Sequence, residues 1–411
     1  MKLGLFVLAV LCFLASVNLS SQTPPLVELT SADGTAEDTF GTSVAALGNT
    51  LVVGAPSATV AGANFRSGAA YVFVNAGSGW NQIAKLVPSD GGDDDFGSAV
   101  AIGMNTIAVG APKKNPHRVG GIYIFVQPPG GWSDMTETAR LDASDQLVHT
   151  IGSRVAITGD GNTVLATRPL GAVFGFVKPQ GGWANTIHAD FEMFAPPGVL
   201  GFATSVAATK DTVAVSSALS ALGQAGAVYV YSLPMNLAGT PKLQPIAILS
   251  PSDGVTNDEW DSVAISGNVI VAGAPYHATG GAAYVFVEPP AGWSDMTQTA
   301  ELSAAGLPAE SGFGFSVATS GKNVAVGAPG YVPGGNGVFF GQGAFYLFTQ
   351  PPGGWADSST PKVKVVAPDG STRDVLGNSI AISGSTVVSG APMHNVHSNK
   401  DQGAAYGVSP Q

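Results

Sequence analysis

The residues best suited to hold a cation are carboxylates in short glycine-containing loops that recur along the 411-residue chain. These residues are Asp33, Glu37 and Asp38; Asp90, Asp93, Asp94 and Asp95; Asp253, Asp258 and Glu259; and Asp369 and Asp374. The run Asp93, Asp94, Asp95 is the best metal-site candidate, and Ca²⁺ is the cation that prefers oxygen ligands. Aspartate before glycine also forms turns without any ligand, so we favour a solvated rim of turns for these loops.

Histidines form a second set of candidate ligands, each placed shortly after a recurring Pro. They are His117, His277, His394 and His397. His394 and His397 lie three residues apart in MHNVH, in an expected loop, but two histidines are too few for a closed zinc site. We therefore expect these four to be exposed polar loop residues.

No arrangement typical of catalysis occurs in the sequence. There is no nucleophile–base pattern, no G-x-S-x-G, no H-E-x-x-H and no phosphate-binding loop. The glycine-rich PPGGW strings precede apolar strand-like segments rather than helices, so they are turns. The sequence thus identifies no catalytic residue and no ligand-binding residue, and we expect a protein that is not an enzyme and has no cofactor beyond the candidate Ca²⁺.

The elements that position these residues belong to one recurring block, first seen as FGTSVAALGNTLVVGAP. The seven copies occupy residues 40–56, 96–112, 151–169, 202–217, 259–275, 313–329 and 376–392. Within a block, two short Val/Ile-rich segments flank turns such as Gly48-Asn49 and Gly267-Asn268, which is typical of a β-hairpin. The glycine of each GAP triplet is expected to lie where backbone crowding leaves no room for a Cβ.

Each block, which holds the first two strand-like segments, is followed by a variable loop, a third segment of the type GAAYVFV, and a fourth segment such as NQIAKLVPSDG. The GAAYVFV-type elements begin at Gly68, Gly120, Gly171, Gly226, Gly281, Gly343 and Gly403. Their alternation of aromatic and aliphatic residues indicates strands, and no window shows helical periodicity. The sequence predicts an all-β fold, a seven-bladed β-propeller of four-stranded antiparallel blades.

The last copy lacks its fourth segment, because the chain ends soon after GAAYGVS. Residues 26–34, LVELTSADG, match the fourth segments AKLVPSDG and AILSPSDG but have no block before them. We expect this N-terminal strand to join the last blade and close the ring, which removes an open edge.

The N-terminus predicts export. Lys2 precedes an uncharged apolar stretch, Leu3–Val17, and small residues follow, so residues 1–22 read as a signal peptide and residues 24–411 as the propeller. An uncleaved anchor is the alternative. Cys12 is the single cysteine, so the processed chain has no thiol and suits an oxidising compartment. The formal charge of −11 argues against nucleic acid and anionic membranes as partners.

Tryptophans recur at the position expected to open the fourth strand. They are Trp80, Trp132, Trp183, Trp293 and Trp355. Such an array could stack on sugars, but equivalent placement in five repeats favours a role in blade packing. Trp260 differs, because it aligns with the glycine of the Phe-Gly pair and predicts a local rearrangement.

The seven blocks resemble FG-GAP repeats, both those of the integrin α-chain N-terminal propeller and, more closely, the short-form repeats of exported bacterial proteins. The resemblance covers about residues 24–411 and implies a seven-bladed propeller, an extracellular setting and a binding or adhesion role. One feature departs from it: the integrin-type calcium loop D-x-D-x-D-G is replaced by turns such as LGN and SGN, and the third repeat has Asp160 alone. The family's calcium sites are therefore not transferred.

We expect a secreted or cell-surface monomer, not inserted in a membrane after signal cleavage, that binds an extracellular protein or a glycan. The expected binding face holds the long loops, which are those after GAP and those between blades. A hydrolase or lyase with a site in the central channel is one alternative, but the innermost strands, such as SVAAL and SIAIS, are apolar, with Arg154 as their lone charge. A purely structural cell-surface component is the other.

Overall fold

The computed structural model describes residues 26–60, 66–77, 79–91, 94–113, 120–143, 150–168, 171–219, 225–233, 241–255, 258–278, 280–338 and 340–409. The expected signal peptide, residues 1–22, lies outside them. The described residues contain no helix, and hence none long and apolar enough to cross a membrane.

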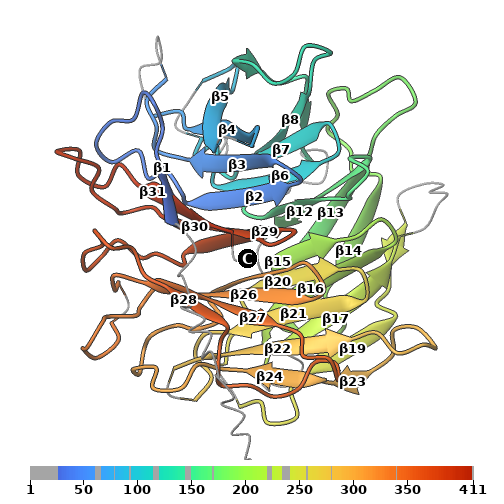
Figure 1. Ribbon diagram of the computed structural model, residues 1–411. Coiled ribbons are helices and arrows are strands. Elements are labelled where there is room, and N and C mark those ends of the chain that lie inside the picture. Colours follow the sequence, from blue (N-terminus) through green and yellow to red (C-terminus); the bar gives the residue numbers. More distant parts are fainter. Residues whose placement is uncertain are drawn as a thin grey trace, which may run out of the picture.

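Seven small sheets surround a common centre, each running from an inner to an outer strand (Figure 1). Blade 1 contains β2 (Ser43–Leu47), β3 (Thr50–Ala55), β4 (Ala69–Asn75) and β5 (Trp80–Val87); blade 2 contains β6 (Ala99–Gly103), β7 (Thr106–Ala111), β8 (Gly121–Val126) and β10 (Ala139–Leu141). Blade 3 contains β11 (Val155–Ile157), β12 (Thr163–Arg168), β13 (Ala172–Val177) and β14 (Phe191–Phe194). Blade 4 contains β15 (Leu200–Ala208), β16 (Thr212–Leu219), β17 (Ala227–Ser232) and β19 (Ala247–Ser250).

The remaining blades repeat this order. Blade 5 contains β20 (Ser262–Ser266), β21 (Val269–Ala274), β22 (Ala282–Val287) and β24 (Ala300–Leu302). Blade 6 contains β25 (Ser316–Thr319), β26 (Asn323–Ala328), β27 (Ala344–Thr349) and β28 (Val363–Val365). Blade 7 contains β29 (Ser379–Ser383), β30 (Thr386–Ala391), β31 (Ala404–Val408) and β1 (Leu26–Leu29). The predicted seven-bladed all-β propeller is confirmed.

The ring closes through the N-terminal strand, as predicted. In Figure 1 the blue strand β1 lies against the red strand β31. Leu26 pairs with Val408 and Leu29 with Ala405 in an antiparallel register. On the inner strand of the same blade, the hydroxyl of Ser379 donates to the carbonyl of Gly41 at 2.8 Å. The outer and the inner strand of the last blade are therefore both bound to the first part of the chain.

The GAP glycines stand where neighbouring blades approach each other most closely. A Cβ on Gly54 would overlap the carbonyl of Gly97 in the next blade, and a Cβ on Gly390 would overlap the carbonyl of Gly41. Gly110, Gly273 and Gly327 face the next blade in the same way. The expected crowding is confirmed, and glycine is required there because the backbones themselves are in contact.

Three blades carry a fifth, outermost strand that the sequence did not predict. These short strands are β9 (Met135–Thr136), β18 (Lys242–Leu243) and β23 (Met296–Thr297), which pair in parallel with β5, β14 and β19. In addition, a side chain two residues after a tryptophan caps the neighbouring outer strand: Asp134 accepts from the backbone of Lys85 at 2.7 Å, and Asp357 from that of Glu301 at 2.8 Å. These contacts cover edges that would otherwise be open.

The tryptophans pack into the blades, in keeping with the favoured interpretation. Trp132, Trp183 and Trp355 are buried in core clusters, and Trp80 and Trp293 are partly buried against them. Only Trp80 opens its fourth strand. Trp132 lies seven positions ahead of Ala139, where β10 begins, so the predicted position is wrong for this tryptophan and likewise for those in blades 3, 5 and 6.

Trp260 takes the place of the phenylalanine, not of the glycine. Its ring is fully buried and stacks on Tyr284 at 5.2 Å, as the ring of Phe40 packs on Tyr71 at 5.6 Å. The residue before Trp260, Glu259, has a positive φ of 45°, and the residue before Phe40, Thr39, has one of 56°. Blade 5 has therefore lost the glycine and is one residue shorter here, which corrects the sequence alignment.

Candidate functional site

The loops that follow GAP and the loops between blades meet on one side of the propeller. The backbone of Ser57 donates to the carbonyl of Asp38 at 3.3 Å, and that of Lys113 to the carbonyl of Asp94 at 3.2 Å. The predicted sharing of a face is confirmed. We call this side, made of both sets of loops, the GAP face.

One aspartate in each of four blade-to-blade loops is buried rather than solvated. These are Asp38, Asp94, Asp258 and Asp374, each two residues before the buried aromatic or leucine that enters the blade. The carboxylate of Asp374 accepts from the backbone and hydroxyl of Ser371, both at 2.8 Å, and that of Asp38 accepts from Thr35 in the same way. The expectation of a uniformly solvated rim is wrong at these four positions, which are buried. The carboxylates of Asp38, Asp258 and Asp374 accept hydrogen bonds that close their own loops.

A second aspartate in the same four loops is exposed and contacts a tyrosine of the third strand. Tyr123 donates to Asp90 at 2.8 Å, Tyr284 to Asp253 at 3.1 Å, and Tyr406 to Asp369 at 3.0 Å. The outer-strand residue paired with the tyrosine then decides the local charge. That residue is Lys85 opposite Tyr71, Arg140 opposite Tyr123, Glu301 opposite Tyr284 and Glu28 opposite Tyr406.

Blades 1 and 2 neutralise the exposed aspartate with a basic side chain. The Nζ of Lys85 lies 2.6 Å from Asp33, and the guanidinium of Arg140 lies 2.8 Å from Asp90. In these two acidic turns a basic side chain neutralises the aspartate. The resulting ion pairs lie at a partly exposed surface and need no ligand.

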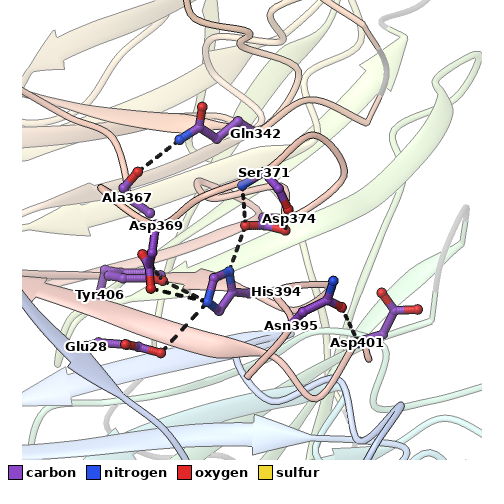
Figure 2. A network of polar contacts seen from close by, with 10 residues as sticks. All are labelled: Glu28, Gln342, Ala367, Asp369, Ser371, Asp374, His394, Asn395, Asp401 and Tyr406. Carbon is purple, nitrogen blue, oxygen red and sulfur yellow. Dashed lines mark hydrogen bonds and ion pairs between the residues drawn. The ribbon is translucent and has the colours of Figure 1, made fainter. Parts of the chain in front are cut away.

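Blade 7 replaces the base with Glu28 and adds His394 (Figure 2). His394 is only 5% exposed, so the prediction of an exposed loop histidine is wrong for it. Its Nδ1 lies 2.7 Å from the buried carboxylate of Asp374. Its Nε2 faces Asp369 Oδ2 at 3.6 Å and Glu28 Oε1 at 3.9 Å. Three segments far apart in sequence thus converge on one imidazole.

Blade 5 repeats this arrangement with different residues. The Nδ1 of His277 lies 3.0 Å from the buried Asp258, and its Nε2 lies 3.7 Å from Asp253 Oδ2. Glu301 completes the group, as Glu28 does in blade 7. Among the described residues these are the two groups of His, Asp and Glu whose ligand atoms all lie within 4.8 Å of one another. We call them the blade 5 cluster (Asp253, His277, Glu301) and the blade 7 cluster (Glu28, Asp369, His394).

The surroundings shift the protonation of these groups. Burial, followed by the charge of Asp369, raises the pKa of Glu28. Burial and the charge of Asp253 likewise raise the pKa of Glu301. Burial alone would lower the pKa of His394, but the hydrogen bond and charge of Asp374, with Asp369 and Glu28, outweigh it and raise that pKa. The carboxylates make each cluster a negatively charged site that favours a positive charge.

An apolar pocket of about 510 Å³ opens among the loops of blades 5, 6 and 7 on the GAP face. Tyr276 and Met393, the residues just before the two cluster histidines, line it. Phe315, Phe340, Val375 and several prolines complete the lining, with Glu310 as its carboxylate. Tyr276 and Phe340 are each 45% exposed, which is high for large apolar side chains. Pockets of this size and character are typical of ligand sites.

The central channel is lined by all seven inner strands and is apolar. Its residues include Ala45, Val100, Ile157, Val206, Ile265, Val317 and Ile380, and Thr319 is the polar residue among those that line it. Arg154 stands just before β11, as expected, and Asp261 stands just before β20. Burial and the charge of Glu259 raise the pKa of Asp261 to about 6, while Arg154 acts in the opposite direction.

The other predicted residues are not among the ligands of the two clusters. Asp93 and His117 are outside the described residues, and His397 is exposed. Asp94 is buried, and Asp95 forms an ion pair with Lys113 at 2.8 Å. The proposed cation site at Asp93, Asp94 and Asp95 stays a prediction.

Sequence reasoning treated the acidic loops and the histidines separately and missed Glu28 and Glu301. The sequence feature that could have revealed them is the outer-strand residue opposite the tyrosine. This residue is basic in blades 1 and 2 and acidic in blades 5 and 7, the two blades with a histidine two residues after the GAP proline. The Asp253–His277 and Asp369–His394 pairs could have been found by aligning those three positions together.

The family model for the FG-GAP repeat matches residues 26–73, 80–125, 245–286 and 360–408. Each matched segment begins in or shortly before an outer strand and ends in the third strand of the next blade, so the sequence repeat is offset by one strand from the structural blade. The four matches contain the four exposed aspartates that face a tyrosine, Asp33, Asp90, Asp253 and Asp369. A comparison with curated proteins finds no significant match to the chain.

Proposed function

Because the chain is a β-propeller built from FG-GAP repeats, we propose that it is a non-enzymatic binding protein that recognises a protein or a glycan through its GAP face. The observation that carries this proposal is the apolar pocket between blades 5 and 7. Exposed aromatic side chains in a concave site are typical anchors for a partner's side chain or for a sugar ring. Here Tyr276 and Phe340 would fill that role.

The chemistry of the channel favours binding over catalysis. A hydrolase or lyase in the channel needs carboxylates or histidines projecting inward, to act as acid and base. The described side chains that line the channel cavity are aliphatic apart from Thr319, and the charged Arg154 and Asp261 stand just before the inner strands β11 and β20. The exposed aromatic groups lie instead in the pocket on the GAP face. A purely structural role would not account for an exposed aromatic side chain such as Tyr276 in an apolar pocket, and this favours a ligand.

An extracellular or cell-surface setting belongs to the same proposal. It is supported by the signal-like residues 1–22, by the net charge of −11 and by the position of the single cysteine, Cys12, within that segment, which leaves the propeller without a thiol. The closed ring, with its outer edges partly covered, is consistent with a monomer.

A binding screen tests the proposal. The purified chain would be applied to arrays of extracellular protein domains and of glycans, and each hit would be measured by surface plasmon resonance. Tyr276→Ser and Phe340→Ser should each weaken binding at least about 10-fold, as expected for anchor residues in a pocket. Ligand recovered from the mixture should be chemically unchanged.

Ile187→Ser is the matched control. Ile187 is 48% exposed, close to Tyr276 and Phe340, but it lies in the connection between β13 and β14, away from the pocket. This variant should bind like the wild type. Ligands that respond to none of the pocket substitutions, or that are cleaved during the assay, would contradict the proposal.

A further inference from the structure

We propose that the blade 5 and blade 7 clusters are two binding sites for a divalent transition-metal ion of the Zn²⁺ class. The ligands would be Asp253, His277 and Glu301 in one site, and Glu28, Asp369 and His394 in the other. This inference is independent of the proposed pocket ligand. It concerns only side chains that the fold already brings together.

The hydrogen bonds of the blade 7 cluster leave several acceptor atoms facing one another at its centre. The Nδ1 of His394 donates to Asp374, because a carboxylate can only accept. The hydroxyl of Tyr406 donates to Asp369, so its proton is also used. A neutral His394 then points the lone pair of Nε2 at the oxygens of Tyr406, Asp369 and Glu28. A positive charge placed among these acceptors, either a proton on Nε2 or a metal ion, would be stabilised by all of them.

The separations between these atoms suit a metal better than a proton. A charge-assisted hydrogen bond from Nε2 to a carboxylate would be about 2.7–2.9 Å long. The carboxylates lie 3.6 and 3.9 Å from Nε2 in blade 7 and 3.7 Å from it in blade 5, whereas the Tyr406 hydroxyl lies 3.2 Å from Nε2 of His394. Two ligand atoms on a tetrahedral Zn²⁺, with bonds of about 2.0–2.2 Å, lie about 3.4 Å apart. Small movements of exposed carboxylates would bring both clusters to that spacing.

Each histidine is also held as metal-binding histidines are held. The buried carboxylates of Asp374 and Asp258 bind Nδ1 of His394 and His277, at 2.7 and 3.0 Å. This contact fixes the ring orientation and directs Nε2 toward the carboxylates of the cluster. The geometry recurs in two blades of one chain, with the histidine two residues after the GAP proline each time.

The ligand set favours zinc over calcium. Zn²⁺ binds both imidazole nitrogen and carboxylate oxygen, and with three protein ligands a fourth position remains for water. Ca²⁺ takes six to eight oxygens and has no preference for imidazole. Each cluster offers one nitrogen and two carboxylates, so Ca²⁺ would be poorly coordinated there.

Blades 1 and 2 provide an internal comparison. Their exposed aspartates occupy the same place, yet Lys85 and Arg140 stand where Glu301 and Glu28 stand in the other two blades. A fixed ammonium or guanidinium there takes the position of the cation, at 2.6 and 2.8 Å from the aspartate. In blades 1 and 2 a basic side chain of the protein supplies the positive charge, whereas in blades 5 and 7 a bound metal ion would supply it.

The blade 7 site would also reinforce ring closure. Its ligands come from β1, from the loop between blades 6 and 7, and from the loop after GAP. A metal bound there would fasten the closing strand to the last blade, because Glu28 belongs to β1. The blade 5 site would fasten equivalent loops beside Tyr276.

Isothermal titration of the folded chain with Zn²⁺, without a polyhistidine tag, tests the proposal. The wild type should bind about two Zn²⁺ ions, one for each cluster. Glu28→Lys and Glu301→Lys should each remove one site, and the double variant should bind none. Lysine reproduces the Lys85–Asp33 pair, so these variants should fold and keep their metal-free melting temperature. Zn²⁺ should raise the melting temperature of the wild type but not of the double variant.

Two further measurements make the outcome decisive. His394→Gln should lose the blade 7 site, whereas His397→Gln, which changes an exposed histidine nearby, should keep it. If a protonated histidine is the natural counter-charge, the wild type will not bind Zn²⁺ at about 100 µM and neutral pH, and the proposal fails. It also fails if the lysine variants still bind two ions, or if Ca²⁺ displaces Zn²⁺.

Discussion

Glu28 of the first strand lies directly opposite Tyr406 of the last strand, so the two ends of the chain form one antiparallel pair. Deleting residues 24–31 should therefore open the ring. Leu29 is 4% exposed and packs in a core cluster with Phe40 and Tyr71, and removing such a side chain costs about 1.5–3 kcal/mol. The backbone pairs along β31 are lost as well. We expect a clear fall in melting temperature and a tendency to associate through the exposed edge.

Thermal unfolding with light scattering checks this prediction. The matched control is Val27→Thr, because Val27 is 41% exposed on the same strand and the change leaves the strand in place. The control should melt close to the wild type. A truncated chain that melts at the wild-type temperature and stays monomeric would contradict closure by β1.

The second prediction concerns the contact between blades 7 and 1. Gly390→Ala places a methyl group against the carbonyl of Gly41, and both partners are backbone atoms that cannot rotate away. We expect a loss of about 1–3 kcal/mol in the free energy of unfolding, the usual cost of overpacking. Gly130→Ala is the control, since no atom lies within 4 Å of the added Cβ and the change should be nearly neutral. Denaturant titrations of both variants measure the difference, and equal stabilities would contradict it.

The fold could be predicted from the sequence because its determinants are local and repeated. Turns such as Gly48-Asn49 and the orphan segment at residues 26–34 carry their structure in a few neighbouring residues. The clusters could not be predicted in the same way. His394 gains its role from Asp374, 20 positions away, and from Glu28 near the start of the chain. Predicting the cluster therefore requires knowing that three separate sequence segments meet in space.

The outer edges and blade 5 show the same limit. The strands β9, β18 and β23 each have two residues, and they form because a neighbouring blade offers a free edge, not because of their own propensity. Trp260 was misplaced because a block alignment keeps the register constant. The ring contacts in the structure reveal the missing residue.

Trp260 itself provides the third prediction. Trp260→Phe should cost little, because phenylalanines fill this place in other blades, as Phe40 and Phe313 do against Tyr71 and Tyr346. Trp260→Ala should cost about 3–5 kcal/mol, the usual penalty for emptying a large buried site. Urea titrations followed by circular dichroism compare the two. The prediction fails if alanine is tolerated as well as phenylalanine.

The last prediction concerns Asp261, whose pKa is raised to about 6 by burial and by Glu259, against the opposing charge of Arg154. A folded pKa above the unfolded value means that the native state binds the extra proton between about pH 4 and pH 6. Stability contributed by that proton is therefore lost as the pH rises through this window, and above it the buried charge costs about 1 kcal/mol, allowing for partial solvent screening.

Asp261→Asn should melt at a higher temperature than the wild type at pH 7, and the difference in melting temperature should shrink as the pH falls to 4. Arg154→Gln should act in the opposite direction, because it removes the charge that stabilises the carboxylate. Asp211→Asn, at an exposed site, is the control and should follow the wild type at every pH. Parallel melting curves for wild type and Asp261→Asn across this range would mean that Asp261 ionises as it does in the unfolded chain.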